Sequence, residues 1–297
     1  ALNVGKRISV CLEQKKTVPL RLRLLQRLFY PLVYKKFQAA FGGEMVLFVS
    51  GGAPLNPEIA RFFHAMGVLI LEGWGATEAT APATLNQPGD FRFGSVGKPL
   101  PNVTVKLAED GELLIKGDNI FKGYWNLPEE TANAFTEDGF YRTGDIGKID
   151  DDGFVYIVDR KKELIITAGG KNIPPAPIEQ LLEQSTLIEQ AFVHGDRRKF
   201  VSALLVLNRE ELHRIASLQD IPPLDNILLK HPLIREYVQA EVDAVNLRLP
   251  RFMQIKKFRI LLEPFSIESG ELTPTLKKKR KVIEEKYRDL LDSMYEE

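Results

Sequence analysis

Cysteine and net charge are both scarce in this sequence. Cys11 is the one cysteine among 297 residues, which rules out an internal disulfide and suits a reducing compartment. Forty basic residues balance forty acidic ones, so the composition argues against a globally basic nucleic-acid-binding protein and leaves only a local basic patch open. No apolar run approaches the roughly 18 residues that a membrane-spanning helix needs. These absences favour a cytoplasmic protein without a nucleic-acid partner.

Several common catalytic signatures are also missing. The four histidines show no metal-ligand spacing, and with one cysteine there is no zinc signal. No G-x-S-x-G nucleophile elbow occurs. The stretch "TAGGK" is not a phosphate loop, because Ile165 stands where that loop needs glycine and Asn172 where it needs serine or threonine. Zinc, serine-hydrolase and P-loop chemistries are therefore disfavoured.

The chain starts at Ala1, with neither an initiating methionine nor a charged-then-apolar leader. We therefore expect it to be part of a longer protein. At 33.6 kDa it can bury a substantial core and form two structural units.

Residues 15–41 are basic and apolar, with no acidic residue. Leu24, Leu28 and Leu32 recur at helical spacing, although Pro31 interrupts the pattern between Leu28 and Leu32. One interpretation is a helix on a membrane surface, near an insoluble substrate. The favoured alternative is an ordinary core-facing helix with a charged outer face.

A strand–helix–strand pattern follows this segment. The run Val46–Val49 predicts a buried strand that ends in a glycine turn, residues 57–66 a helix, and "VLILEGWG" the next strand. This order indicates a parallel α/β layer. Beyond Gly97, short alternating segments separated by "EDG" and "DDG" turns predict hairpins in a small β unit.

The pattern of predicted strands and helices changes near Asp159, where we place a domain boundary. "ELIIT", "QAFVHG", "FVSALLVLN" and residues 257–262 predict strands. "PIEQLLEQ", residues 209–218, residues 233–248 and the C-terminal segment predict helices. The second half is thus expected to be a separate α+β domain.

"EGWGATEAT" places glycines, a hydroxyl and an acid directly after a predicted strand. Gly73 and Gly75 would let a ligand approach the backbone closely. Thr77 offers a hydroxyl to a phosphate, and Glu78 offers an oxygen to Mg²⁺. A strand-end turn with incidental polar residues explains the pattern equally well.

Two further stretches carry weaker signals. "YRTGDIG" puts Asp145 on a predicted turn, where a carboxylate can accept both hydroxyls of a ribose, although Gly-Asp is common turn chemistry. "DRKKELIITAGGKNI" puts Asp159 and Arg160 at the domain boundary. A few residues that absorb backbone rotation there would form a hinge, and Arg160 could contact a nucleotide.

The basic run "LKKKRK" near the C-terminus has three interpretations: a solvated charge run, a nucleic-acid or nuclear-targeting patch, or the surroundings of one reactive lysine. It precedes a predicted helix with an apolar face at Ile283, Tyr287 and Leu291. Cations at the positive end of a helix favour a bound anion. The pattern alone does not say which lysine would contact that anion.

Together and in order, these stretches resemble the adenylate-forming superfamily of AMP-binding enzymes, specifically the long-chain acyl-CoA synthetases. "GGAPL" resembles the adenine-contacting loop, and "GWGATE" the Y-G-x-T-E signature. "YRTGD" resembles the ribose-binding turn, "DRKKELIITAGGKNI" the hinge and thiol-tunnel strand, and "LTPTLKKKR" the motif with the catalytic lysine. The five ordered matches cover most of the chain from Phe48 onward.

The resemblance implies an α/β and α+β fold in two parts. Residues 1–158 would be the later portion of an adenylation domain, with a parallel α/β layer and a small β-barrel-like unit. Residues 159–297 would be a smaller, mobile α+β lid domain with its hinge at Asp159 and the catalytic lysine.

The resemblance also implies a nucleotide-binding residue set in the first part. Thr77 and Glu78 would hold phosphate and Mg²⁺, and Asp145 the ribose hydroxyls. The other positions that would contact the nucleotide are Gly52, Ala53, Pro54, Trp74, Gly75 and Arg160.

In the second part, Lys277 would be the catalytic lysine, because T-G-K-I-x-R aligns with Thr275–Arg280. The other basic residues of that run would be solvated or bound by an acidic partner. Gly169 and Gly170 would belong to the strand presented to the attacking thiol.

The sequence departs from the family pattern in three places. Leu276 replaces a glycine. Trp74 replaces tyrosine, which would reshape the acyl entrance. The Ser/Thr/Gly-rich phosphate loop with its lysine does not occur, and we expect it upstream.

The implied activity is that of an acid–thiol ligase. A long-chain fatty acid reacts with ATP and Mg²⁺ to give an acyl-adenylate, which CoA then converts to acyl-CoA and AMP. Two alternatives stay open: transfer to acyl carrier protein, favoured by basic surfaces at 15–36 and 277–281, and a truncated nucleotide-binding module without full activity. Nucleic-acid binding ranks last, because the basic run leads into an acidic helix.

Overall fold

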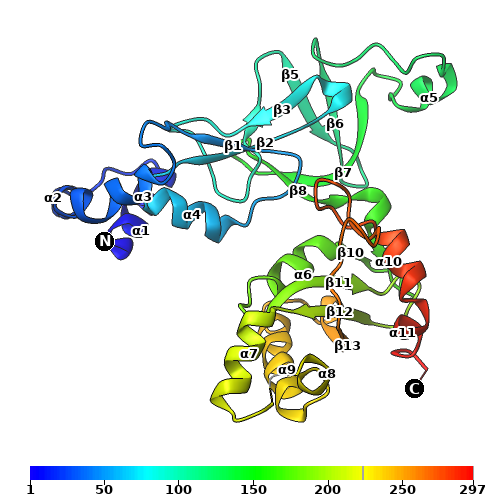
Figure 1. The fold of residues 1–297 in the computed structure, drawn as a ribbon. Coiled ribbons are helices and arrows are strands. Elements are labelled where there is room, and N and C mark those ends of the chain that lie inside the picture. The colour runs from blue at the N-terminus through cyan, green and yellow to red at the C-terminus, as the bar shows by residue number, and fades with distance from the viewer. Residues whose placement is uncertain (223, 297) are drawn as a thin grey trace. The chain divides into compact units, whose positions relative to one another are not determined.

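The computed structural model describes residues 1–222 and 224–296. The chain divides into two compact units, Ala1–Val158 and Asp159–Glu297 (Figure 1). Each unit has its own core.

Unit 1 contains five α-helices and eight strands over its described length. The helices are α1 (Leu2–Glu13), α2 (Leu20–Phe29), α3 (Lys35–Ala39), α4 (Pro57–Ala65) and α5 (Pro128–Asn133), with a π-helical turn at Tyr30–Tyr34 and a 3₁₀ turn at Thr77–Ala79. The strands are β1 (Phe48–Ser50), β2 (Ile70–Ala76), β3 (Ala81–Leu85), β4 (Lys98–Pro99), β5 (Val103–Leu107), β6 (Glu112–Gly117), β7 (Tyr141–Ile149) and β8 (Val155–Arg160).

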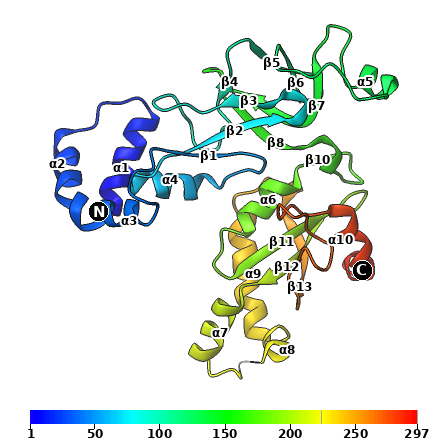
Figure 2. The same ribbon diagram turned by 45° about the horizontal axis from the view of Figure 1, so that its top comes forward.

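The first sheet of unit 1 has the order β1-β2-β3-β4 (Figure 2). β1 and β2 are parallel and connected through α4, which confirms the predicted parallel layer, and β3 then pairs antiparallel to β2. The predicted strand Val46–Val49 is wrong in position and in burial. The strand is Phe48–Ser50, and Val46 and Val49 are 85% and 61% exposed, because β1 is an edge strand with one neighbour.

The second sheet of unit 1 has the order β5-β6-β7-β8. β5 and β6 form the predicted antiparallel hairpin, with Val105 opposite Ile115. One core joins this sheet to the first: Trp74 and Ala83 pack with Leu113, Ile115 and Tyr141. This shared core fixes the end of β2 against β7.

The N-terminal helices pack through a close contact between α1 and α4. A Cβ on Gly5 would lie 1.9 Å from the carbonyl oxygen of Ala65, so only glycine fits there. Beside it, Ser9 Oγ lies 2.7 Å from Nδ1 of His64, whose ring packs against Phe91 and Phe93. Burial lowers the pKa of His64 to about 4.

This buried histidine predicts a pH dependence of stability. The unfolded chain binds a proton near the ordinary pKa of about 6.5, whereas the folded chain resists protonation down to about 4. The contribution is therefore complete above pH 6.5 and decreases as the pH falls, by about 3 kcal/mol at pH 4. Urea unfolding at several pH values measures it. His64→Gln should lose this part of the slope, and His213→Gln, at an exposed site, should keep it.

The basic segment forms α2 and α3, and its leucines differ in exposure. Leu22 is the buried residue of α2, while Leu24, Leu28 and Leu32 are 55%, 63% and 62% exposed. Leu25, Phe29 and Val33 of the same stripe are half-buried, and Leu22 packs with Ile8 and Val18. Both interpretations of this segment therefore stay predictions. No helix of the described residues is long and apolar enough to cross a bilayer.

Unit 2 contains six α-helices and five strands in its described part. The helices are α6 (Pro175–Leu182), α7 (Arg209–Leu218), α8 (Asp225–Leu228), α9 (Pro232–Asn246), α10 (Arg280–Lys286) and α11 (Arg288–Asp292), with 3₁₀ turns at Lys161–Glu163 and Arg251–Met253. The strands are β9 (Ile165–Ile166), β10 (Asn172–Ile173), β11 (Ile188–His194), β12 (Val201–Leu207) and β13 (Ile255–Leu261).

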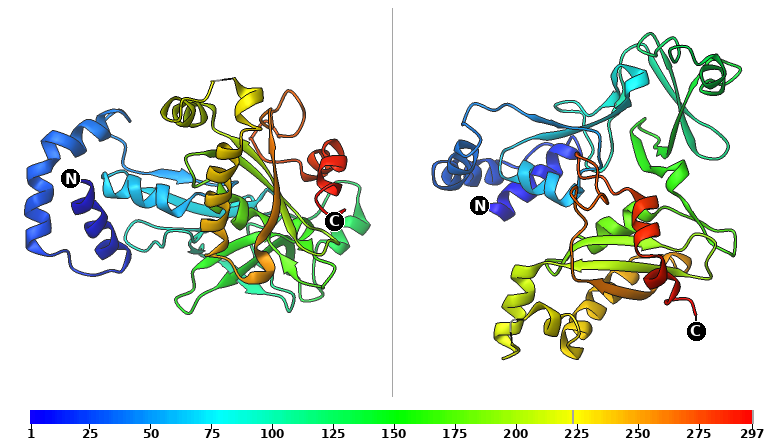
Figure 3. Two further views of the ribbon diagram at one scale, coloured as in Figure 1. Left: turned by 90° about the horizontal axis from the view of Figure 1, so that it is seen from below. Right: turned by 45° about the vertical axis from the view of Figure 1, so that its right-hand side comes forward.

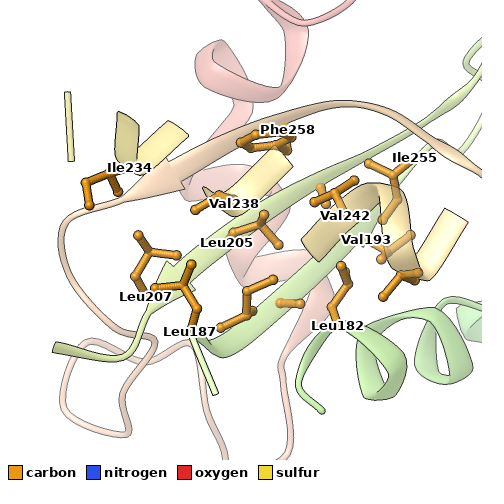
Figure 4. Packing of buried hydrophobic residues seen from close by; sticks show 14 of the residues in the cluster. Leu182, Leu187, Val193, Leu205, Leu207, Ile234, Val238, Val242, Ile255 and Phe258 are labelled. Carbon is orange, nitrogen blue, oxygen red and sulfur yellow. The ribbon is translucent and has the colours of Figure 1, made fainter. Parts of the chain in front are cut away.

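Unit 2 contains the three-stranded sheet β11-β12-β13 (Figure 3). Buried side chains form a core on both faces of this sheet. β12 is the central strand and is buried along its whole length. On one face, the stripe Ile234, Val238 and Val242 of α9 packs toward Leu205 and Phe258 (Figure 4). The other face carries a second cluster, to which α10 and α11 contribute Ile283 and Leu291.

The C-terminal segment is two short helices rather than the single helix predicted. The helical path is interrupted at Tyr287, with φ −106° and ψ 20°. The Tyr287 ring packs against Phe265, with the ring centroids 6.1 Å apart. Tertiary packing of this aromatic residue therefore outweighs the continuous helical pattern.

Candidate active site

Two loops of unit 1 lie at the same edge of the first sheet, because each follows one of the parallel strands β1 and β2. A Cβ on Gly51 would lie 3.6 Å from the carbonyl oxygen of Gly73. The backbone N–H of Leu55 donates to Oε1 of buried Glu72 at 3.1 Å. The loop that contains Gly52, Ala53 and Pro54 is thus tied to β2, and these three residues are exposed.

The loop after β2 depends on a glycine. A Cβ on Gly75 would lie 2.1 Å from the carbonyl oxygen of Ala81, so a side chain cannot be accommodated. The chain reverses through the 3₁₀ turn Thr77–Ala79, and Thr80 follows with φ 51°. This turn leaves Thr77 exposed and Glu78 partly exposed.

The carboxylate of Asp145 lies against Trp74. The indole Nε1–H of Trp74 donates to Oδ2 of Asp145 at 2.8 Å, and both side chains are buried. The two residues are 71 positions apart in the sequence. The structure thereby brings the "GWGATE" and "YRTGD" segments together in one place.

Asp145 lies within strand β7 and not on the predicted turn. Tyr141, Thr143 and Asp145 alternate inward along the strand. The turn-like features are a bulge opposite β6 and φ +71° at Gly144, whose N–H donates to Oε1 of Glu112 at 2.9 Å. A bulge re-aims neighbouring side chains without ending the strand, so the prediction of a turn was wrong.

Glu78 has a partner that the sequence analysis missed. The hydroxyl of Tyr124 donates to Oε1 of Glu78 at 2.9 Å. Burial, together with this carboxylate, raises the pKa of Tyr124. The backbone N–H of Phe121 also donates to the carbonyl oxygen of Glu78, at 2.7 Å. No local pattern points to these contacts, since 46 residues separate Glu78 from Tyr124.

Glu78 fits a magnesium–nucleotide complex better than a metal ion held by the protein alone. Over residues 1–222 and 224–296, no group of three or more histidine, cysteine, aspartate or glutamate side chains is arranged to hold a metal. Mg²⁺ commonly takes one or two carboxylates and completes its shell with substrate phosphates and water. A single, partly exposed carboxylate at the end of a strand is compatible with that arrangement.

In unit 2, Asp159 binds the start of α6. Its Oδ1 accepts from the N–H of Arg160 at 2.7 Å, and its Oδ2 accepts from the N–H of Ala176 at 3.0 Å. Burial raises the pKa of Asp159, although these two backbone hydrogen bonds oppose the shift. Arg160, the last residue of β8, is exposed.

Gly169 and Gly170 lie in a turn and not in the predicted strand. The strands β9 and β10 pair on either side, with Ile166 opposite Asn172. Gly170 has φ +72°, and its N–H donates to the carbonyl oxygen of Thr167 at 2.8 Å. A left-handed residue of this kind closes a hairpin, so "ELIIT…NI" is a hairpin with an exposed glycine tip.

Lys277 lies on an exposed turn of unit 2. Its N–H donates to Oγ1 of Thr273 at 3.0 Å, and its carbonyl oxygen accepts from the N–H of Thr273 at 2.8 Å. Leu276, which replaces the family's glycine, has φ +60° and is 68% exposed. The turn needs a left-handed residue there, which explains why glycine suits this position.

The basic run is not uniformly solvated, so the expectation of solvation is wrong for Lys278 and Arg280. Lys277 and Lys279 are exposed, and no ion pair within the described part of the chain involves either of them. Lys278 and Arg280 point inward and bind Glu179 of α6 at 3.1 Å and 2.7 Å. Glu179 escaped the sequence analysis, although an acid between Ile178 and Leu182 on a buried helix face was a usable signal.

Comparison with known proteins covers both units. The sequence profile of the AMP-binding enzyme family matches residues 16–125, and that of the AMP-binding enzyme C-terminal domain matches residues 162–297. The chain belongs to the AMP-binding enzyme family. This confirms the predicted membership of the adenylate-forming superfamily.

A long-chain-fatty-acid–CoA ligase of Mycobacterium bovis is 41% identical over 279 residues, which cover 93% of this chain and 46% of the relative. The adenylation domain of a carboxylate reductase from Mycobacterium chelonae superposes with a TM-score of 0.68 at 27% identity, over 100% of this chain and 45% of that one. ATP-bound MatB from Rhodopseudomonas palustris has a TM-score of 0.63 at 31% identity, over 85% and 47%. The chain thus spans about half the length of the proteins it matches.

Proposed function

We propose that the protein activates long-chain fatty acids with ATP and transfers the acyl group to the thiol of CoA. The observation that carries this proposal is the Trp74–Asp145 hydrogen bond, which joins two of the sequence motifs beside the Thr77–Ala79 turn. The similarity to a long-chain-fatty-acid–CoA ligase supports the substrate class.

The residues of unit 1 would bind the nucleotide. Asp145 accepts hydrogen bonds from the ribose hydroxyls, and the loop Gly52–Pro54 borders the adenine. Gly75 lets the ligand approach the backbone, and the hydroxyl of Thr77 donates to phosphate oxygen. Glu78 would hold Mg²⁺, which supplies positive charge to the phosphates when it is bound.

Residues of unit 2 would serve the two half-reactions. A carboxylate oxygen of the fatty acid attacks the α-phosphorus, and pyrophosphate leaves. Lys277 stabilises the negative charge shared by the reacting groups, because an ammonium aimed at developing charge acts most strongly in the transition state. The thiol sulfur then attacks the acyl carbon, and AMP leaves. The exposed turn at Gly169–Gly170 would border the thiol, Arg160 would contact the nucleotide, and backbone rotation at Asp159 would separate the two steps.

Trp74 predicts a measurable effect on nucleotide affinity. Trp74→Phe removes the indole N–H that holds Oδ2 of Asp145 and keeps an aromatic ring in the core. A hydrogen bond to a charged group contributes about 1.5–3 kcal/mol, so we expect the dissociation constant for ATP to rise by about 10- to 100-fold. Titration calorimetry measures this change.

The nucleotide itself provides the control for that prediction. 2′,3′-dideoxy-ATP has no hydroxyls for Asp145, so its affinity should be nearly equal for the wild type and Trp74→Phe. An equal loss of affinity for both nucleotides would mean that Trp74 acts on the site through packing alone.

A second property concerns the exposed leucines of α2 and the turn after it. Leu20, Leu24, Leu28 and Leu32 are exposed beside Arg21 and Arg27, in a segment with no acidic residue. We propose that this surface contacts anionic lipid, since apolar and basic side chains together favour the membrane interface. Co-sedimentation should be stronger with phosphatidylserine vesicles than with phosphatidylcholine vesicles and weaker for Leu24→Ser/Leu28→Ser. Equal recovery with both vesicles would overturn this proposal.

The acceptor is tested by comparing thiols. The native protein, ATP, Mg²⁺ and palmitate should convert CoA to palmitoyl-CoA. Preferential acylation of holo-acyl carrier protein would favour the carrier-protein alternative, for which the basic residues at 15–36 provide complementary charge. Nucleotide binding without palmitate-dependent pyrophosphate release would favour the binding module without ligase activity.

A further inference from the structure

The basic run divides into outward and inward residues. Lys277 and Lys279 are exposed, whereas the side chains of Lys278 and Arg280 are 19% and 12% exposed. Lys278 lies in a β-bridge with Leu272, where successive side chains point to opposite sides, and Arg280 begins α10. Each inward residue therefore fixes the direction of its outward neighbour.

The inward residues share a buried carboxylate on α6. Glu179 is 5% exposed, and its two oxygens bind Lys278 at 3.1 Å and Arg280 at 2.7 Å. The same side chain accepts from the N–H of Val193 at 2.8 Å. Glu183, one turn further along the chain, binds Lys278 at 2.8 Å. Lys278 is thus held by two carboxylates at once.

The backbone on the other side of Lys277 is also fixed. Leu272 pairs with Lys278 in an antiparallel bridge, and the N–H of Lys279 donates to the carbonyl oxygen of Glu271 at 2.7 Å. The Glu271 side chain is fully buried and pairs with Lys286 of α10. The Lys277 turn is consequently held at both of its ends.

The N-terminus of α6 is bound by the first residue of unit 2. Asp159 accepts a hydrogen bond from the N–H of Ala176, and Glu179 lies one turn further along the same helix. One eight-residue helix therefore connects Asp159 to the anchor of the lysine turn. A backbone rotation at Asp159 would carry Lys277 with it as part of one body.

We propose that Lys278, held by Glu179 and Glu183, is a positioning residue that orients Lys277 for adenylation. Lys278 acts through the backbone and touches neither substrate nor nucleotide. This inference rests on the proposed catalytic role of Lys277 and adds the contact that fixes its direction.

Lys278→Met tests the inference in the native protein, because methionine keeps an unbranched apolar stem and loses the ammonium. The kcat of palmitate-dependent pyrophosphate release should fall about tenfold, with the KM for ATP within twofold. Thioester formation from supplied palmitoyl-adenylate should stay within twofold. Lys278→Arg, which can still bind both carboxylates, should restore most of the adenylation rate. Lys279→Met removes the same charge from an outward position and should leave both half-reactions unchanged.

Three results would overturn the inference. Unchanged adenylation in Lys278→Met would show that the anchor is dispensable. Equal loss of both half-reactions would show that Lys278 only maintains the fold. An equal decrease in Lys279→Met would assign the effect to charge near the turn. If Lys277→Ala itself spares adenylation, the proposed function fails, and that outcome is separate from all three.

Discussion

Replacing Lys277 with alanine is expected to lower the rate of acyl-adenylate formation by about 100- to 1,000-fold, the usual loss when one group aimed at transition-state charge is removed. Lys277 suits this role because it is exposed on a turn whose backbone is held by Thr273 and by the Leu272–Lys278 bridge. Its ammonium is available for a substrate anion, whereas that of Lys278 is bound to two carboxylates.

Measuring the two half-reactions separately distinguishes a role of Lys277 in adenylation from a role in the whole reaction. Thioester formation from supplied acyl-adenylate should be nearly unaffected in Lys277→Ala, because the phosphoryl chemistry is then already complete. Pyrophosphate release and thioester formation, each followed by rapid quench, measure the two steps. Lys279→Ala is the matched control, with the same charge change at another exposed position. Equal loss of both steps in Lys277→Ala would contradict the assignment.

Replacing Glu179 with alanine should destabilise unit 2 by about 3–5 kcal/mol, because it leaves Lys278 and Arg280, whose side chains are 19% and 12% exposed, without their shared carboxylate. Burial by itself would raise the pKa of Glu179, but Arg280 and Lys278 outweigh it and lower that pKa. The carboxylate is therefore charged at neutral pH. Its contribution to stability is present above the ordinary glutamate pKa and is lost as the pH falls below it.

Amide hydrogen exchange across β11 and β12 reports the stability of unit 2 directly, since both strands are in its core. Glu183→Ala is the control: Glu183 is 30% exposed and binds Lys278 but not Arg280, so its loss should be about 1 kcal/mol. Replacing Glu179, Lys278 and Arg280 together with apolar residues should recover much of the lost stability. Unchanged exchange in Glu179→Ala would refute the buried ion-pair account.

Local sequence patterns were sufficient where a segment's structure depends on its own periodicity. The β1–α4–β2 order followed from an apolar run, a glycine turn and a helical segment. Asn56 caps α4, because its side-chain oxygen accepts a hydrogen bond from the backbone N–H of Glu58. The helix predicted at residues 233–248, observed as α9 (Pro232–Asn246), likewise follows from helical spacing. The α/β and α+β class of the fold was predicted correctly for the same reason.

Contacts between distant segments could not be predicted in the same way. The sequence around Gly144 predicts a turn. In the structure this segment pairs with β6 through a bulge, so Asp145 lies inside a strand. No local pattern in the sequence indicates that Lys278 is bound inside the protein, because its partner Glu179 precedes it by 99 residues. The resemblance to a family located the motif residues, whereas the residues that hold them in place came only from the folded chain.

The most direct test is the stoichiometry of the complete reaction catalysed by the native protein. Incubation with ATP, Mg²⁺, palmitate and CoA should yield AMP, pyrophosphate and palmitoyl-CoA in equal amounts, and omission of palmitate should abolish all three. Formation of ADP in place of AMP, or release of AMP without dependence on palmitate, would contradict the proposed function.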